Sequence, residues 1–165
     1  MLLAIDIGNT NKNGKIFSAP RQLGSANICP AKPCTDRIIK TFDLPSQQYS
    51  FNKFLKKIGS LKITDILICS VVPKLTKLVT KDLSGLSSLR PGKRPYIIGR
   101  DLRVPIKNCY RKPRQVGQDR LVNAYAGAKL YGLPLIVVDF GTAITFDLIS
   151  NTGAYQGGLI LPGIG

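Results

Sequence analysis

The 165-residue sequence contains no histidine, and its four cysteines form no Cys-x-x-Cys pair. Structural zinc sites are built from closely spaced cysteine and histidine, so this class of site is not expected. Cys29 and Cys34 enclose two prolines and a lysine, Cys69 lies in an apolar run, and Cys109 stands alone. We therefore expect reduced thiols with a mainly structural role.

Long hydrophobic runs are also missing. No apolar stretch approaches the roughly 20 residues that a membrane-spanning helix needs. The N-terminal Met-Leu-Leu-Ala-Ile run is interrupted by Asp6 and lacks a basic lead, which is unlike a signal peptide. The 44% hydrophobic content is that of a soluble globular protein. The sequence predicts a cytoplasmic location and no membrane partner.

Acidic residues are few: nine, against 24 lysines and arginines, for a formal charge of +15. Clustered basic residues would indicate nucleic-acid binding, because they neutralise phosphates. Here they are scattered, with no RRM, zinc-finger or helix-turn-helix signature, over Lys53, Lys56, Lys57, Lys74, Lys77, Lys81, Lys93, Arg94, Arg111, Lys112 and Arg114. A basic surface on a protein that handles small anions is favoured, and a nucleic-acid partner is not expected.

The sequence is organised around residues 135–148, where four apolar residues run into Asp139 and a Gly141–Thr142 turn follows. Such a run suits a buried strand with its carboxylate at the end of the sheet. Residues 2–10 repeat this pattern position by position, with Asp6 and Gly8 in the corresponding places. One copy would fit an ordinary hairpin, but two indicate a duplicated unit. Two turns with N–H groups, a hydroxyl and a carboxylate could clamp a polyphosphate and its metal.

Periodicity predicts an α/β arrangement in the order β-β-β-α-β-α-β. The expected strands are 2–6, 11–17, 37–42, 64–72 and 95–98, the helices are 49–58 and 74–83, and 18–35 is an irregular loop. A second segment starts near Val116, with a helix at 119–131, the Asp139 hairpin and a strand at 154–161. We expect domains at 1–115 and 116–165.

The second segment would begin to repeat the first and then stop. It is expected to hold no helices that cover its sheet, leaving an open parallel or mixed sheet with a bare face. On this view the chain is cut short at Gly165.

Five collinear motifs together resemble the type III pantothenate kinases, members of the actin, Hsp70 and sugar-kinase superfamily. They are Asp6–Asn11, Ser70–Pro73, Val116–Arg120 with Asn123, Asp139–Ala143 and Gly153–Gly163. The resemblance covers nearly the whole sequence. It implies an actin-like ATPase (ribonuclease H-like) fold whose second copy is incomplete. It also implies ATP-dependent phosphorylation of the primary hydroxyl of pantothenate, the first step toward coenzyme A.

The resemblance implies a first phosphate loop formed by Asp6, Ile7, Gly8, Asn9, Thr10, Asn11, Lys12 and Asn13. Asp6 would hold Mg²⁺ directly or through water, and Thr142 would contact ATP from the second turn. Asp139 would help to bind a monovalent cation, K⁺ or NH₄⁺. Whether Lys12 or Lys15 supplies the basic residue that often assists the first loop stays open.

The same resemblance implies a pantothenate pocket formed by Tyr110, Gly117, Gln118, Asp119 and Arg120, with Asp119 as the proton acceptor. Phosphoryl transfer depends on positioning and charge neutralisation, and general-base help adds about 10²–10⁴-fold. The planar fork of Arg120 suits the pantothenate carboxylate or the developing phosphate charge.

Each of these residues also has a structural interpretation. Asp119 could be the acidic first turn of a surface helix, where it complements the helix dipole. Tyr110 could be a half-buried loop aromatic, and Asn123 a solvent-facing helix residue. The glycines after Gly153 could simply form β-turns, although Gly157 and Gly158 inside an apolar strand suggest that another group comes close.

This sequence departs from the family pattern in three respects. Gln118 stands where the family commonly has alanine, and Lys12–Lys15 is more polar than the usual second strand. The family also continues beyond the Pro162–Gly163 pair. The continuation would carry a threonine for pantothenate, a glycine-rich adenosine-binding segment, covering helices and much of a homodimer interface. An active kinase, or a piece of one, is therefore one hypothesis, and a non-catalytic relative like the Bvg accessory factor is the other. We expect the isolated chain to fall short of the rate of a full-length relative.

Overall fold

The structure is a computed structural model that describes residues 1–18, 37–86 and 94–163. The expected loop at 18–35 lies almost entirely outside the described residues. The chain divides into two compact units, Met1–Asp101 and Leu102–Gly165, and each is described by itself.

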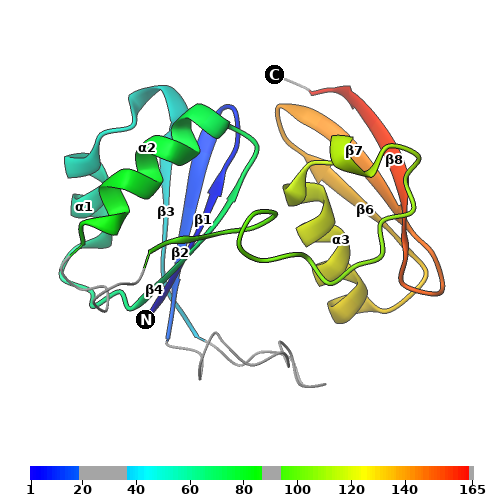
Figure 1. Ribbon diagram of the computed structural model, residues 1–165, viewed down its shortest axis with the longest axis horizontal. Coiled ribbons are helices and arrows are strands. Elements are labelled where there is room, and N and C mark those ends of the chain that lie inside the picture. Colours follow the sequence, from blue (N-terminus) through cyan, green and yellow to red (C-terminus); the bar gives the residue numbers. More distant parts are fainter. Residues whose placement is uncertain (19–36, 87–93, 164–165) are drawn as a thin grey trace. The chain divides into compact units, whose positions relative to one another are not determined.

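The first unit contains a five-stranded mixed sheet in the order β3-β2-β1-β4-β5 (Figure 1). Strands β1, β2 and β3 form an antiparallel meander, and β4 and β5 continue the sheet in parallel with β1. The strands are β1 (Leu2–Ile7), β2 (Asn11–Phe17), β3 (Ile38–Pro45), β4 (Asp65–Ser70) and β5 (Tyr96–Ile97). The predicted order of elements is confirmed for this unit.

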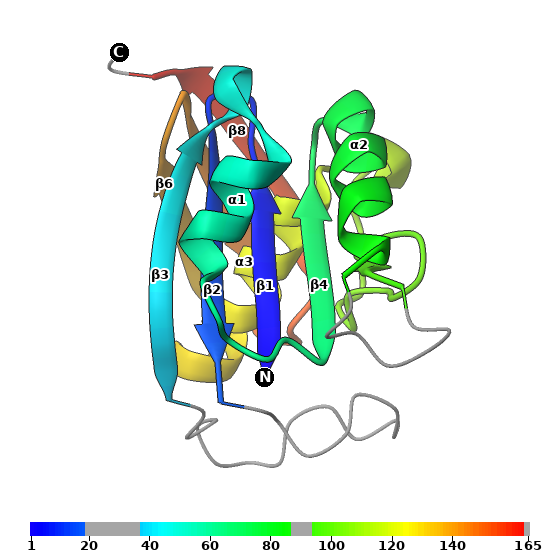
Figure 2. The same ribbon diagram turned by 90° about the vertical axis from the view of Figure 1, so that its left-hand side faces the viewer.

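Two helices, α1 (Phe51–Ile58) and α2 (Pro73–Ser84), cover the same face of this sheet (Figure 2). Alternate residues of the strands point toward them, and α1 buries Phe54 and Ile58 while α2 buries Val79 and Leu83. Gly14 belongs to this face because a Cβ there would lie only 2.2 Å from the ring of Phe42. The polar β2 strand therefore still contributes to the core.

The second unit contains α3 (Gln118–Tyr131) and the strands β6 (Leu135–Phe140), β7 (Ala143–Ile149) and β8 (Tyr155–Pro162). Its sheet is an antiparallel meander in the order β6-β7-β8. The segment before α3, assigned to the first domain from sequence, lies with this unit. Tyr155 exchanges backbone hydrogen bonds with Lys107 and Cys109 at 2.8 Å.

The expectation that no helix covers the second sheet is wrong, and so is the expectation of a parallel or mixed sheet. Helix α3 lies along one face (Figure 1), where Ala124 and Gly127 are buried against β6 and β7. The helix precedes the strands in sequence, and its small residues let it approach them closely. The other face is bare, as expected: exposed hydrophobic residues on it include Ile136, Val138, Phe140, Leu148, Leu159 and Leu161.

The duplicated pattern in the sequence corresponds to a repeated meander. Strand β1 turns through residues 8–10 into β2, and β6 turns through residues 141–142 into β7; a third antiparallel strand follows each time. In the described ranges, no helix is long and apolar enough to cross a membrane.

Candidate functional site

The first turn is held in shape by Ser46, which belongs to a short 3₁₀ helix, η1 (Ser46–Gln48). Its backbone N–H donates to the Thr10 carbonyl at 2.8 Å, and its hydroxyl donates to the Gly8 carbonyl at 2.9 Å. Asp6 is exposed near the end of β1, on the face opposite Ile5 and Ile7. No sequence signal pointed to Ser46, because it lies far along the chain from the turn that it fixes.

Lys12 does not extend into solvent beside this turn. It is 1% exposed, and its ammonium group donates to the carbonyls of Pro45 at 3.2 Å and Ser46 at 3.0 Å. The same group lies 5.1 Å from the centroid of the Tyr49 ring. Burial lowers the pKa of Lys12 from its usual value. Lys12 lies in β2 and not in the turn, and it ties that strand to the last residue of β3 and to the residue that follows.

The second turn is closed by the end of β8. The Gly141 N–H donates to the Ala143 carbonyl at 3.1 Å, and the Gly163 N–H donates to the Thr142 carbonyl at 3.2 Å. A Cβ at Gly163 would lie 2.4 Å from that Thr142 oxygen, so only glycine permits this approach. Asp139 is exposed, and its register partner on β7 is Thr145.

Neither turn has a ready-made metal cage. Among the described residues, no three His, Cys, Asp or Glu side chains are grouped as metal ligands. Mg²⁺ in phosphate-transferring sites commonly keeps several waters and takes only one or two carboxylates plus the phosphates. The single exposed carboxylate of Asp6 fits that donor set, and Asp139 offers one oxygen-donor group beside the second turn.

Helix α3 begins at the residues predicted to bind substrate. Gly117 is its N-cap and Gln118 its first residue. Asp119 lies in the first turn, half-buried, and its carboxylate accepts a hydrogen bond from the Arg120 backbone N–H at 2.8 Å. An acidic side chain at this position also complements the helix dipole.

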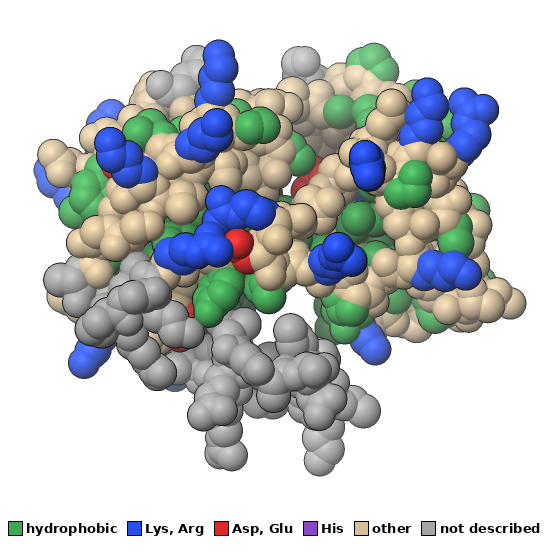
Figure 3. Space-filling model, in the orientation of Figure 1, with side chains coloured by type: hydrophobic (Ala, Val, Ile, Leu, Met, Phe, Trp, Pro, Cys, Tyr) green, Lys and Arg blue, Asp and Glu red, His purple; other side chains and the backbone are tan. Residues whose placement is uncertain are grey.

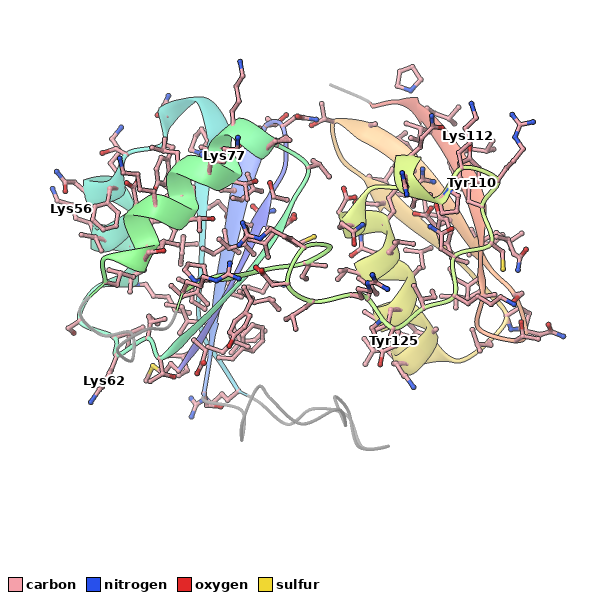
Figure 4. The ribbon with its side chains drawn as sticks, in the orientation of Figure 1. Lys56, Lys62, Lys77, Tyr110, Lys112 and Tyr125 are labelled. Atoms are coloured by element: carbon pink, nitrogen blue, oxygen red, sulfur yellow. The ribbon has the colours of Figure 1, made fainter. Side chains whose placement is uncertain are left out.

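A cavity of about 350 Å³ lies beside the start of α3, within the second unit. It is lined by Tyr110, Gln115, Val116, Arg120, Tyr155, Gly158, Leu159 and Ile160. The structure therefore brings together Tyr110 and Arg120, two of the predicted substrate-binding residues. Gly117, Gln118 and Asp119 are not among its lining residues. Figure 4 shows Tyr110 in the loop beside β8.

Arg120 is held by a buried acid, which accepts a hydrogen bond from a buried phenol, and sequence reasoning missed both. Its Nε donates to Asp147 Oδ1 at 2.8 Å, and its Nη2 forms an ion pair with the same oxygen at 2.6 Å. The Tyr155 hydroxyl also donates to Asp147 Oδ1, at 2.6 Å. Burial and this hydrogen bond raise the pKa of Tyr155, so its hydroxyl stays protonated. An acid on the helix-facing side of an otherwise apolar strand was the available signal for Asp147.

Gly157 and Gly158 allow other side chains to lie directly against the backbone of β8, as their place in an apolar strand suggested. A Cβ at Gly157 would lie 2.8 Å from the Tyr110 ring. A Cβ at Gly158 would lie 2.7 Å from Arg120 Nη2 and 1.7 Å from the Phe146 carbonyl oxygen. These glycines therefore make room for Tyr110 and Arg120, two of the side chains that line the cavity.

The first unit has a cavity of its own, about 560 Å³, beside α2. Its lining includes Lys77, Lys81 and Arg100, but none of the residues predicted to bind ATP or pantothenate. Basic side chains are spread over the visible surface of each unit and do not form one patch (Figure 3).

Comparison with known proteins identifies a family that matches this sequence. The family described as "Type III pantothenate kinase" matches residues 2–165. A type III pantothenate kinase of Persephonella marina is 42% identical over 165 residues, covering 99% of this chain and 60% of that protein. One from Sulfurihydrogenibium sp. is 39% identical, covering 99% of this chain and 61% of that protein. The chain thus spans about 60% of the length of these relatives.

A solved structure supports the fold. A Ppx/GppA phosphatase from Aquifex aeolicus superposes with a TM-score of 0.51 at 12% sequence identity, covering 99% of this chain and 52% of that one. The repeated meander and this likeness confirm the actin-like ATPase fold expected from sequence, with a duplicated unit that is partial in its second copy.

Proposed function

This chain belongs to the type III pantothenate kinase family, and on that premise we propose that it serves ATP-dependent phosphorylation of pantothenate to 4'-phosphopantothenate. The observation that carries the proposal is the cavity beside the start of α3, which Tyr110 and Arg120 both line, and Arg120 directly follows Asp119 in the first turn of that helix. A small cavity with one cation suits a small carboxylate-bearing substrate.

In this proposal Asp119 accepts the proton from the pantothenate hydroxyl. An alcohol is a poor nucleophile that loses its proton late in phosphoryl transfer, so a carboxylate mainly orients the alcohol before it accepts the proton. Gly117 and Gln118 would shape the entrance beside it. The half-buried position of Asp119 in the first turn of α3 is compatible with reaching a ligand.

Contacts to ATP are proposed for each unit by itself. In the first unit they come from the first turn and the strand ends beside it: Asp6, Ile7, Gly8, Asn9, Thr10, Asn11 and Asn13. Lys12 would support this turn through its hydrogen bonds to the carbonyls of Pro45 and Ser46. Thr142 and Asp139 act from the second turn, Asp139 toward K⁺ or NH₄⁺. A magnesium ion held by Asp6 would neutralise phosphate charge.

We further propose a homodimer for the family-length protein and a cytoplasmic location. A reaction that consumes ATP is expected where ATP is made and used. The bare face of the β6-β7-β8 sheet leaves apolar surface that the family's continuing segment or a second copy would cover.

The test uses the 165-residue chain. Calorimetric titration should detect pantothenate binding and Mg²⁺–ATP binding, and mass spectrometry should detect potassium-dependent 4'-phosphopantothenate. Because the chain is shorter than its relatives, we expect turnover below that of the Persephonella marina protein. Asp119→Asn should retain pantothenate binding and lose product, whereas Asp43→Asn, an exposed residue of β3, should change neither. Absence of both binding events would refute the proposal.

A further inference from the structure

The guanidinium of Arg120 is anchored on one side only. Nε and Nη2 bind Asp147, and Nη2 also donates to the carbonyls of Phe146 at 3.3 Å and Leu159 at 3.4 Å. Nη1 has no partner within the described part of the chain. The planar fork has five N–H donors, so two of them remain available on Nη1.

The side chains that fix the Arg120 guanidinium are buried. The Asp147 side chain is 2% exposed and Tyr155 is fully buried, while the Arg120 side chain keeps 14% exposure. A buried ion pair is tolerated when further hydrogen bonds satisfy its atoms, and loss of one partner leaves an uncompensated charge. One Asp147 oxygen receives Arg120 twice and Tyr155 once, which fixes the plane of the guanidinium.

The ligand side of this arrangement is the 350 Å³ cavity. Arg120 is the only charged residue among its described lining residues, which are otherwise polar, aromatic or aliphatic. A fixed cation in such a wall selects an anionic group, and a guanidinium prefers the planar oxygens of a carboxylate or the oxygens of a phosphate.

We infer that Asp147 and Tyr155 are positioning residues that orient Arg120 so that its free Nη1 receives an anionic group of the ligand in this cavity. The inference rests on the proposed function for the identity of that ligand. Pantothenate would supply a carboxylate and ATP a phosphate. In either case Asp147 acts through Arg120. Tyr155 lines the cavity, but its hydroxyl acts on the anion through its hydrogen bond to Asp147.

The experiment compares pantothenate with panthenol, in which an alcohol replaces the carboxylate. Calorimetry would measure both dissociation constants for the wild-type chain and for Tyr155→Phe, Asp147→Asn and Tyr125→Phe. A carboxylate held by Arg120 should make wild type bind pantothenate at least tenfold more tightly than panthenol. Tyr155→Phe should weaken pantothenate binding about fivefold, the equivalent of one hydrogen bond, and Asp147→Asn more. Neither should change panthenol binding.

Tyr125→Phe is the matched control because Tyr125 lies on α3 (Figure 4), with its ring under the Lys129 ammonium, away from this network. It should bind both ligands as wild type does. Mg²⁺–ATP is titrated into the same proteins. If Tyr155→Phe, or a folded Asp147→Asn, weakened pantothenate and panthenol equally, or weakened none of the three ligands, the positioning role would be overturned. If only Mg²⁺–ATP binding were weakened, the anion would be a phosphate.

A probe independent of pantothenate separates this inference from the proposed function. Propionate and sulfate can be titrated while the Arg120 guanidinium signals are followed by NMR. Saturable shifts that weaken in Tyr155→Phe would uphold the positioning role even if wild type bound no pantothenate. In that case the proposed function alone would fail. Shifts that are absent, or identical in both proteins, would overturn the inference.

Discussion

At the scale of single residues, Gly158 shows how one missing side chain serves the site. It pairs with Asp147 across β7 and β8, and any Cβ there would overlap the Phe146 carbonyl. We expect Gly158→Ala to destabilise the second unit by about 2 kcal/mol or more, because the strands must separate. Gly141→Ala, where a Cβ would lie 3.6 Å from the Ala143 oxygen, should stay within about 0.5 kcal/mol. Urea unfolding followed by circular dichroism would measure both, and equal effects would contradict the argument.

Asp101 illustrates a titration with a defined sign. Hydrogen bonds from Arg100, from the Ile97 N–H and from Arg94 lower the pKa of Asp101 to about 2. The folded pKa lies below the unfolded value of about 3.9, so the stabilisation is complete above that value and is lost as pH falls toward about 2. Melting temperatures measured from neutral to acid pH should show Asp101→Asn to be less stable than wild type. The difference between the two melting temperatures should shrink as pH falls from about 3.9 toward about 2. A gap that stays constant down to about pH 2 would contradict this.

Sequence could predict features that are local along the chain. It placed Asp6 and Asp139 near the ends of their strands because each follows an apolar run and precedes a turn, a pattern contained within a few positions. The roles of the two carboxylates stay predictions. The Arg120–Asp147 pair spans 27 positions and Lys12–Pro45 spans 33. No periodicity encodes such distances. These contacts exist only after the sheet has set its register.

At the scale of elements, hydrophobic periodicity predicted the strands and helices well because each has one buried face. The β3 strand runs to Pro45, beyond the expected 37–42, because its pairing with β2 continues to Asn11. Periodicity did not predict that α3 packs against the sheet of the second unit. That helix carries small residues on its packing side, which pattern reading does not weigh as a hydrophobic stripe.

The close packing of α3 on β6 depends on Gly127. A Cβ there would lie 2.9 Å from Leu135 Cδ1 and 3.1 Å from Val137 Cγ2. We expect Gly127→Leu to destabilise the second unit by about 2 kcal/mol, because overpacking outweighs the better helix propensity. Ala126→Leu, one position away on the exposed side, should change the free energy of unfolding by less than about 0.5 kcal/mol. Similar losses in the two variants would show that packing against β6 is not the cause.

At the scale of the whole molecule, two surface properties oppose each other. The bare face of the β6-β7-β8 sheet exposes Phe140 at 70%, Leu159 at 65% and Ile136 at 62%. Contiguous apolar surface of this kind favours association. The formal charge of +15 makes two copies of the chain repel each other, which opposes their association at low ionic strength. Which property prevails depends on how far the charges are screened.

Salt therefore separates self-association from nucleic-acid binding. Raising salt from about 0.1 M to about 1 M shortens the Debye length from about 10 Å to about 3 Å, so repulsion fades while apolar attraction persists. We expect sedimentation velocity to show more dimer or larger species at high salt. Ile136→Lys should suppress this, whereas Leu130→Lys on α3, equally exposed at 64%, should not. Binding driven by phosphate neutralisation would show the reverse dependence, because counterion release weakens it as salt rises. Duplex DNA retained at low salt, together with a chain that stays monomeric at high salt, would favour a nucleic-acid role for the positive charge.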